Sequence, residues 1–131
     1  MKKKYLLISV IVLFGAVLLA FTPAAKTKDS TVMKINAQQA KNIMDTTQGY
    51  IILDVRTPSE YENGHVPGAI LLPDYELKEK AASILKDKEQ VILVYCRSGS
   101  RSSRAAKNLV DLGYTNIYDF GGIISWPYAT E

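Results

Sequence analysis

The sequence predicts an α/β domain with a mainly parallel central sheet and helices on both faces. Its 131 residues leave room for one compact domain. Tyr50–Val55 and Val91–Tyr95 are apolar runs of strand length, the pattern of strands buried on both faces of a sheet. Segments with helical spacing or helix-capping residues alternate with these runs, and such alternation is typical of a parallel sheet covered on both sides.

The composition excludes several classes of protein. Apolar residues make up 47% and charged residues 22%, which argues against a disordered, collagen-like or polytopic membrane protein. The net charge is +3, but three of the 16 basic residues are Lys2, Lys3 and Lys4, so the rest of the chain carries 13 basic and 13 acidic residues. We therefore expect no nucleic-acid partner, because binding would need a clustered basic surface.

The N-terminal segment predicts export. Lys2–Lys4 precede the 17-residue apolar run Tyr5–Phe21, and small residues follow up to Ala25. This order is typical of a secretory signal peptide, and the run is just short of the ~20 residues that span a bilayer. We expect residues 1–25 to be a signal peptide or membrane anchor, 26–33 a tether and 34–131 the folded domain. The domain would then lie outside the cytoplasm (secreted, periplasmic or anchored facing out), with membrane contact only through this segment.

Two helix starts are marked by capping residues. Asn36, with Gln39 three residues later, predicts a helix over Ala37–Asp45. Residues 57–60, Thr-Pro-Ser-Glu, predict a second helix directly after the first apolar run, with Thr as the cap and Pro in the first turn.

The second half of the chain continues the alternation. The expected elements are a short strand at Ala69–Leu72, a helix within Tyr75–Lys88, a strand at Val91–Tyr95, a helix at Ser102–Leu112 ended by Gly113, a strand at Asn116–Phe120 and a turn at Gly121-Gly122.

Cys96 is the only cysteine of the chain. It cannot form an intramolecular disulfide and is a poor basis for a metal site, so it is either a packed core residue or a chemical reagent. Its place favours chemistry, since it follows the predicted strand Val91–Tyr95 and precedes a predicted helix. Ligands of parallel sheets bind at such carboxyl ends of strands.

The heptapeptide Cys96–Ser102, Cys-Arg-Ser-Gly-Ser-Arg-Ser, has the composition of an anion-binding loop. Arginine side chains and helix N-termini favour a thiolate, which is the nucleophilic form of cysteine. Successive backbone N–H groups can converge on an anion, and Gly99 permits the tight curvature that this requires. Arg97 and Arg101 add positive charge. The alternative is a solvated basic turn, although arginines oppose the helix dipole there unless an anion joins them.

Five segments together resemble a single-domain rhodanese, a rhodanese-like sulfurtransferase. They are Leu53-Asp54-Val55-Arg56, Glu60-Tyr61, Gly64-His65-Val66-Pro67-Gly68-Ala69, the loop with its flanks at 94–102, and Gly121-Gly122-Ile123-Ile124-Ser125-Trp126. The resemblance extends from about Met33 to Trp126. It implies that Cys96 takes a sulfane sulfur from a donor such as thiosulfate, becomes a persulfide, and passes the sulfur to cyanide or a small-molecule or protein thiol, without cofactor or metal. Arg97, Ser98, Gly99, Ser100, Arg101 and Ser102 would then hold the outer sulfur.

Four further residues are expected to support the site. Asp54 ends a buried strand and could be catalytic, but we favour a role in accepting backbone hydrogen bonds that shape the loops. Arg56 and Glu60 are four residues apart and are expected to form a structural ion pair. His65 lies in a Gly/Pro-rich turn, and the resemblance implies a scaffold role. Trp126 is expected in the core.

Three other functions remain open. A phosphatase or arsenate reductase also combines a cysteine, loop amides and an arginine, but its pattern has five residues between Cys and Arg, whereas four separate Cys96 from Arg101 here. No acidic residue is apparent beside the loop to protonate a leaving group. A rhodanese-like binding module often lacks the cysteine. A redox sensor would lack a partner cysteine.

Overall fold

The computed structural model describes residues 31–131, so the predicted signal segment and most of the predicted tether lie outside the described residues. The strands are β1 (Met33–Lys34), β2 (Ile51–Asp54), β3 (Ile70–Leu71), β4 (Ile92–Cys96) and β5 (Ile117–Gly122). The α-helices are α1 (Ala37–Thr46), α2 (Pro58–Glu62), α3 (Leu77–Ile84) and α4 (Ser100–Asp111), with short 3₁₀ turns η1 (Asp74–Glu76) and η2 (Ile123–Ser125). None of the helices within residues 31–131 is long and apolar enough to cross a membrane.

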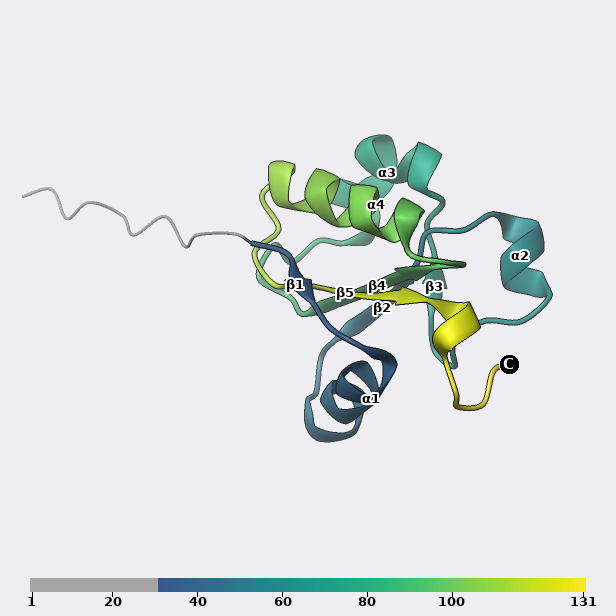
Figure 1. Ribbon diagram of the computed structural model, residues 1–131. Coiled ribbons are helices and arrows are strands. Elements are labelled where there is room, and N and C mark those ends of the chain that lie inside the picture. Colours follow the sequence, from purple (N-terminus) through teal and green to yellow (C-terminus); the bar gives the residue numbers. More distant parts are fainter. Residues whose placement is uncertain (1–30) are drawn as a thin grey trace, which may run out of the picture.

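The five strands form one parallel sheet in the order β1-β5-β4-β2-β3. Helices α3 and α4 cover one face, whereas α1 and the chain after β5 cover the other (Figure 1). Helix α2 lies to one side, beyond the carboxyl end of β2. The predicted α/β fold, with a parallel sheet and helices on both faces, is therefore confirmed. The sheet places β4, which ends in Cys96, at its centre.

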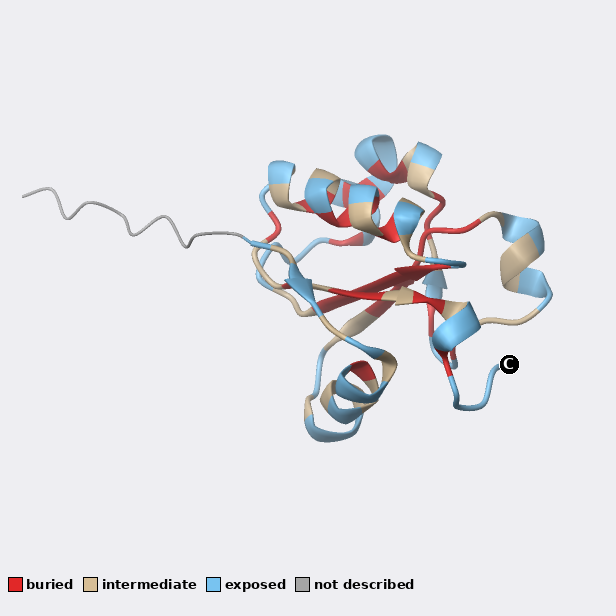
Figure 2. Ribbon diagram, in the orientation of Figure 1, coloured by how far each residue is buried: buried red, intermediate tan, exposed pale blue. Residues whose placement is uncertain are grey.

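The core is divided by the sheet into two apolar clusters, one on each face. All five residues of β4 are buried, which explains its uninterrupted apolar sequence (Figure 2). Side chains alternate along the strand, so Val94 and Cys96 join the cluster under α3 and α4, while Leu93 and Tyr95 join the cluster under α1. Cys96 therefore shares a face with α4.

Both predicted capping boxes are present. The Asn36 side chain accepts the Gln39 N–H at 2.8 Å, and the Asn36 N–H donates to the Gln39 side chain at 2.9 Å. Thr57 and Glu60 make the same reciprocal pair, with both distances at 3.3 Å. Local capping thus fixes where α1 and α2 begin.

The helix predicted within Tyr75–Lys88 is shorter than expected. It consists of η1 and then α3, and it ends at Ile84. Leu85 is buried but leaves helical geometry, and its carbonyl accepts the Tyr114 hydroxyl at 2.6 Å. The residues that follow are polar, so no apolar surface remains to hold a further turn against the sheet.

Three boundaries differ in ways that bear on the site. Met33, expected in the tether, belongs to β1, which pairs with β5. Helix α4 begins at Ser100 rather than Ser102, which shortens the loop after Cys96 to three residues. Gly121-Gly122, expected as a turn, continues β5 because Gly122 pairs with Cys96 across the sheet.

Candidate active site

Cys96 lies at the carboxyl end of β4, and its Sγ accepts the Gly99 N–H at 3.0 Å. The residue is 1% exposed. Gly99 is the N-cap of α4 and has φ of +109°, a conformation that an L-residue rarely adopts. Since Gly99 has no side chain, it caps none of the first-turn N–H groups of α4, which lack partners within the helix. The thiol is therefore held beside amides suited to an anion.

The end of β5 passes directly beneath the loop. A Cβ built on Gly122 would lie 2.2 Å from the Arg97 carbonyl oxygen and 2.7 Å from the Ser98 Cα, so only glycine fits there. The Ile124 N–H also donates to the Arg97 carbonyl at 3.3 Å. The backbone of the loop is thus supported from below by the backbone of β5 and η2.

Arg101 forms a bidentate ion pair with Glu60 of α2, at 2.7 and 2.9 Å. The hydrogen bonds from Arg101 lower the pKa of Glu60 from 4.5 to about 2, and the same contact raises the pKa of Arg101. The predicted Arg56–Glu60 pair is therefore wrong. Arg56 precedes the N-cap of α2, so four-residue spacing does not place it on the same helical face as Glu60.

Arg56 instead pairs with Asp54 in a buried network. Its Nη2 donates to Asp54 Oδ2 at 2.7 Å, and its backbone N–H donates to Oδ1 at 2.9 Å. The Tyr95 hydroxyl donates to Oδ2 at 2.6 Å and accepts the Val66 N–H at 3.1 Å. Burial, reinforced by the hydrogen bond to Asp54, raises the pKa of Tyr95. Asp54 thus accepts one backbone N–H, from Arg56, alongside the Arg56 and Tyr95 side chains, and its loop-shaping role stays a prediction.

His65 and Trp126 both take part in scaffolding contacts. The His65 ring stacks on Tyr61 with ring centroids 3.7 Å apart, and its backbone exchanges two hydrogen bonds with Glu131. Trp126 is 9% exposed and packs in the cluster under α1. Among residues 31–131, neither side chain forms a hydrogen bond with the loop.

The sequence shows no obvious acidic residue beside the loop to protonate a leaving group, but the structure brings two carboxylates close to it. Glu60 reaches Arg101, and the buried Asp119 accepts the Ser102 hydroxyl at 2.8 Å. Asp119 lies in β5, a strand that was predicted, and its carboxyl end meets the same edge of the sheet as Cys96. That shared edge was the signal that could have singled it out.

The predicted loop residues divide into two groups. Arg97, Ser98 and Ser100 are exposed, whereas Ser102 is buried with its hydroxyl between Asp119 and the Gly99 carbonyl. The side chain of Ser102 therefore supports the loop from below. Arg104, two residues further along α4, is exposed and pairs loosely with Asp74 at 3.6 Å.

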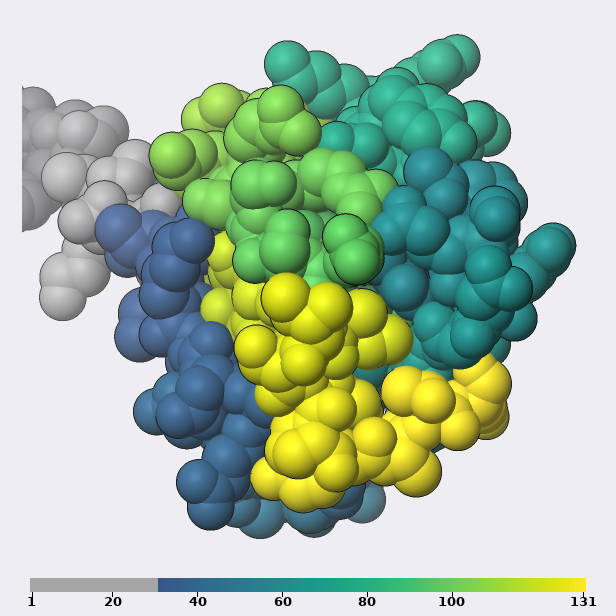
Figure 3. Space-filling view, turned by 45° about the vertical axis from the view of Figure 1, so that its right-hand side comes forward, coloured from purple at the N-terminus to yellow at the C-terminus, as the bar shows by residue number. Residues whose placement is uncertain are grey.

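A hollow of about 330 Å³ lies beside the loop. Its lining includes Arg97 from the loop, Arg56 and Glu60 from the region of α2, and Ile123 and Ile124 from η2. Figure 3 shows the face on which α4 (green), the chain after β5 (yellow) and the region of α2 (teal) meet. The hollow is therefore lined by both basic and acidic side chains and by apolar ones, and Arg97 is the exposed arginine among them.

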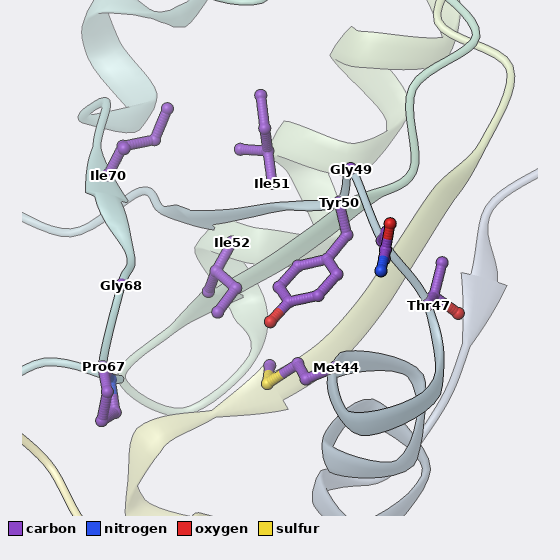
Figure 4. Close-up of a pocket in the computed structure, with 10 residues that line it drawn as sticks. Met44, Thr47, Gly49, Tyr50, Ile51, Ile52, Pro67, Gly68 and Ile70 are labelled. Atoms are coloured by element: carbon purple, nitrogen blue, oxygen red, sulfur yellow. The ribbon is translucent and has the colours of Figure 1, made fainter.

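A second hollow, of about 560 Å³, lies near the amino ends of β2 and β3 (Figure 4). Met44 and Tyr50 lie side by side in it, and Pro67 and Ile70 form another wall. None of its lining residues is charged, and it shares no residue with the loop. Within residues 31–131, no cluster of His, Cys, Asp or Glu could hold a metal ion.

Comparison with known proteins agrees with this architecture. The Rhodanese-like domain family matches residues 36–127. The chain is 41% identical over 71 residues to the thiosulfate sulfurtransferase PspE of Escherichia coli, covering 54% of this chain and 68% of PspE. It is 33% identical over 96 residues to a sulfurtransferase of Allochromatium vinosum, covering 72% of this chain and 88% of that protein.

A solved structure of a rhodanese with anions from E. coli superposes with a TM-score of 0.59 at 35% sequence identity. The match covers 63% of this chain and 96% of that one. The family match includes strands β2 to β5, the loop after β4 and η2. The chain belongs to the rhodanese-like domain family.

Proposed function

We propose that the protein is a sulfurtransferase that carries a sulfane sulfur on Cys96. The Cys96 thiolate attacks the outer sulfur of thiosulfate, the bond between the two sulfur atoms of thiosulfate breaks, and sulfite leaves with that electron pair. A persulfide then remains on Cys96. In the second step cyanide or a thiolate attacks the outer sulfur of the persulfide, and the Cys96 thiolate is regenerated.

The observation that carries this proposal is the Gly99 N–H on Cys96 Sγ at 3.0 Å, at the open N-terminus of α4. Donors aimed at a sulfur favour its anionic form and would also stabilise the charge that develops on it during transfer. No separate general base is required when the nucleophile is already a thiolate. The names of the relatives, thiosulfate sulfurtransferase and sulfurtransferase, support the same chemistry.

The charges around the loop suit an anionic donor and an anionic leaving group. Arg97 is exposed beside the hollow of about 330 Å³, and Arg101 is held in place by Glu60. Both would attract thiosulfate and stabilise departing sulfite. The chain contains one cysteine, so no second cysteine of the same chain resolves the persulfide, and the sulfur passes to an outside acceptor.

The phosphatase alternative has weaker support. Four residues separate Cys96 from Arg101, whereas five separate the cysteine from the arginine in the phosphatase pattern, so the loop here is shorter. Glu60, the acidic residue beside Arg101, has its pKa lowered to about 2, so at neutral pH it holds no proton to give to a leaving group.

The experiment is an intact-mass measurement of the protein before and after thiosulfate. We expect Cys96 to gain the mass of one sulfur atom, and cyanide or a thiol to remove it and release one product molecule per cycle. Cys96→Ser should remove both events, whereas Ser83→Ala, on the exposed surface of α3, should leave them unchanged. Turnover in Cys96→Ser, or hydrolysis of an aryl phosphate faster than sulfur transfer, would overturn the proposal.

We further propose that residues 1–25 direct the protein out of the cytoplasm, so that sulfur transfer takes place in an extracytoplasmic compartment. The support is the order of positive, apolar and small residues in that segment. Fractionation of a bacterial host that expresses the full chain tests this, together with N-terminal sequencing. A soluble cytoplasmic protein that begins at Met1 would contradict it.

A further inference from the structure

Asp119 is a buried carboxylate that the proposed reaction does not use. It is 2% exposed and lies in β5, where it pairs with Val94 of β4. Its side chain contacts Ser102 of α4, so it lies on the face of the sheet that also contains Cys96. Burial of a carboxylate is costly unless hydrogen bonds satisfy it, which makes its partners informative.

Two of its three partners, Ser102 and Gly121, are close to the loop. Asp119 Oδ1 accepts the Ser102 hydroxyl at 2.8 Å and the Gly121 N–H at 3.0 Å. Oδ2 accepts from Lys34 Nζ at 3.2 Å. One carboxylate therefore ties the first turn of α4 to the end of β5 and to β1.

The contact with Gly121 fixes an irregularity in the sheet. Val94 pairs with Asp119, but Cys96, two residues later, pairs with Gly122, three residues later. The end of β5 therefore carries one extra residue, and Asp119 holds the N–H of Gly121 within that irregular stretch. This stretch leads into Gly122, which supports Arg97 and Ser98 from below.

Ser102 is connected to the Cys96 thiol through Gly99. Ser102 Oγ lies 2.8 Å from Asp119 Oδ1 and 3.1 Å from the Gly99 carbonyl oxygen, and both are acceptors for its single proton. Gly99 in turn donates its N–H to Cys96 Sγ. The position of that N–H depends on how the first turn of α4 is anchored.

We propose that Asp119 is a positioning residue for sulfur transfer, because through Ser102 and Gly121 it holds the backbone that places the Gly99 N–H on Cys96 Sγ. The proposal rests on the proposed function. Asp119 touches neither substrate nor thiol and acts only through the loop. A displacement of about 1 Å at a preorganised site lowers the rate by about a hundredfold, so loss of this anchor should be visible in the chemical step.

The test compares Asp119→Asn, Ser102→Ala and the double variant. The measured quantity is the rate constant of Cys96 persulfide formation at saturating thiosulfate, from quenched intact-mass samples, divided by the fraction of folded protein. In each single variant we expect the rate constant of persulfide formation to fall by about tenfold to a hundredfold. The loss should appear mainly in the maximal rate and not in the affinity for thiosulfate, because Arg97 and Arg101 remain to bind the donor. The double variant should match the slower single variant within about twofold, since both changes disturb the same contact between Ser102 and Asp119.

Tyr114→Phe is the matched control. It removes a buried 2.6 Å hydrogen bond just beyond the other end of α4, from the Tyr114 hydroxyl to the Leu85 carbonyl. Its persulfide rate per folded molecule should remain at the wild-type value although its stability falls. If the role of Asp119 were purely structural, Asp119→Asn would likewise be less stable but keep the wild-type persulfide rate per folded molecule.

The outcomes separate this proposal from the function on which it rests. Wild-type protein that gains no sulfur from thiosulfate contradicts the proposed function. Wild-type protein that gains it, together with Asp119→Asn or Ser102→Ala at the wild-type rate, overturns the positioning role alone. Equal losses in Tyr114→Phe overturn it as well. If Asp119→Asn does not fold, Ser102→Ala decides, because it removes the same contact by truncating one hydroxyl.

Discussion

Two buried carboxylates flank the strand that carries Cys96, and they serve different parts of the molecule. Asp54 of β2 pairs with Tyr95, and Asp119 of β5 pairs with Val94, so both lie at nearly the same level of the sheet. Asp54 and Asp119 are 0% and 2% exposed. They point to opposite faces, Asp54 towards the Tyr95 hydroxyl and Asp119 towards α4.

Their partners differ in kind. Asp54 faces Arg56, a permanent cation that is 5% exposed, and the Tyr95 hydroxyl. Asp119 faces a serine hydroxyl, a backbone N–H and Lys34, whose side chain is 67% exposed. Loss of Asp54 would leave the buried Arg56 without an anionic partner, whereas loss of Asp119 would release the first turn of α4. The first carboxylate therefore matters most for stability, and the second for the geometry of the loop.

The largest effect on stability is expected for Asp54→Asn. Arg56 would lose its anionic partner in a buried setting, and we expect the free energy of unfolding to fall by about 3–5 kcal/mol. Asp119→Asn should lose only about 1–2 kcal/mol, since its cation partner, Lys34, is exposed to solvent and no buried charge is left behind. Urea denaturation measures both.

A control variant removes both charges of the buried Asp54–Arg56 pair. In Asp54→Leu combined with Arg56→Met, no unpaired charge is buried, so much of the lost stability should return. Equal losses of unfolding free energy in Asp54→Asn and Asp119→Asn would contradict the different roles of the two carboxylates.

Glu60 extends the comparison to a third, partly exposed carboxylate. Its pKa is lowered from 4.5 in the unfolded chain to about 2 by Arg101. A lowered pKa in the folded state stabilises the protein above the unfolded value, and this contribution disappears as the pH falls from about 5 to about 2.

The measurement is urea unfolding of the wild type and of Glu60→Gln across that range. The wild type should be more stable by about 1 kcal/mol near neutral pH, because the pair is screened by solvent, and the difference should shrink towards zero in acid. A difference independent of pH would show that the Arg101 pair does not depend on the charge of Glu60.

The smallest effect is expected for Lys34→Met. Lys34 reaches Asp119 at 3.2 Å and Ser103 at 3.1 Å, but its exposed ammonium gains little in high dielectric. We expect a change below about 1 kcal/mol in unfolding free energy, with sulfur transfer per folded molecule near the wild-type rate. A loss of sulfur-transfer rate as large as that of Asp119→Asn would show that Asp119 acts through Lys34 and not through Ser102.

Short-range patterns predicted the parts of the fold that depend on a few neighbouring residues. The capping boxes at Asn36 and Thr57 and the strand that ends at Cys96 were all predictable, because each signal acts within one turn or one strand. The prediction failed where a segment's end depends on what packs against it. Leu85, whose carbonyl receives Tyr114, and Gly122, which pairs with Cys96, are examples.

Local patterns were enough to predict the α/β class, the starts of α1 and α2 and the anion-binding character of the segment after β4, because apolar runs, capping residues and loop composition act over short distances. Which carboxylate supports which part of the loop depended on the tertiary packing. Glu60 and Arg101 are 41 residues apart, Ser102 and Asp119 are 17 apart, and both pairs form at the carboxyl edge of the sheet. They meet because β2 and β5 lie on either side of β4, and strand order is set by packing over the whole domain.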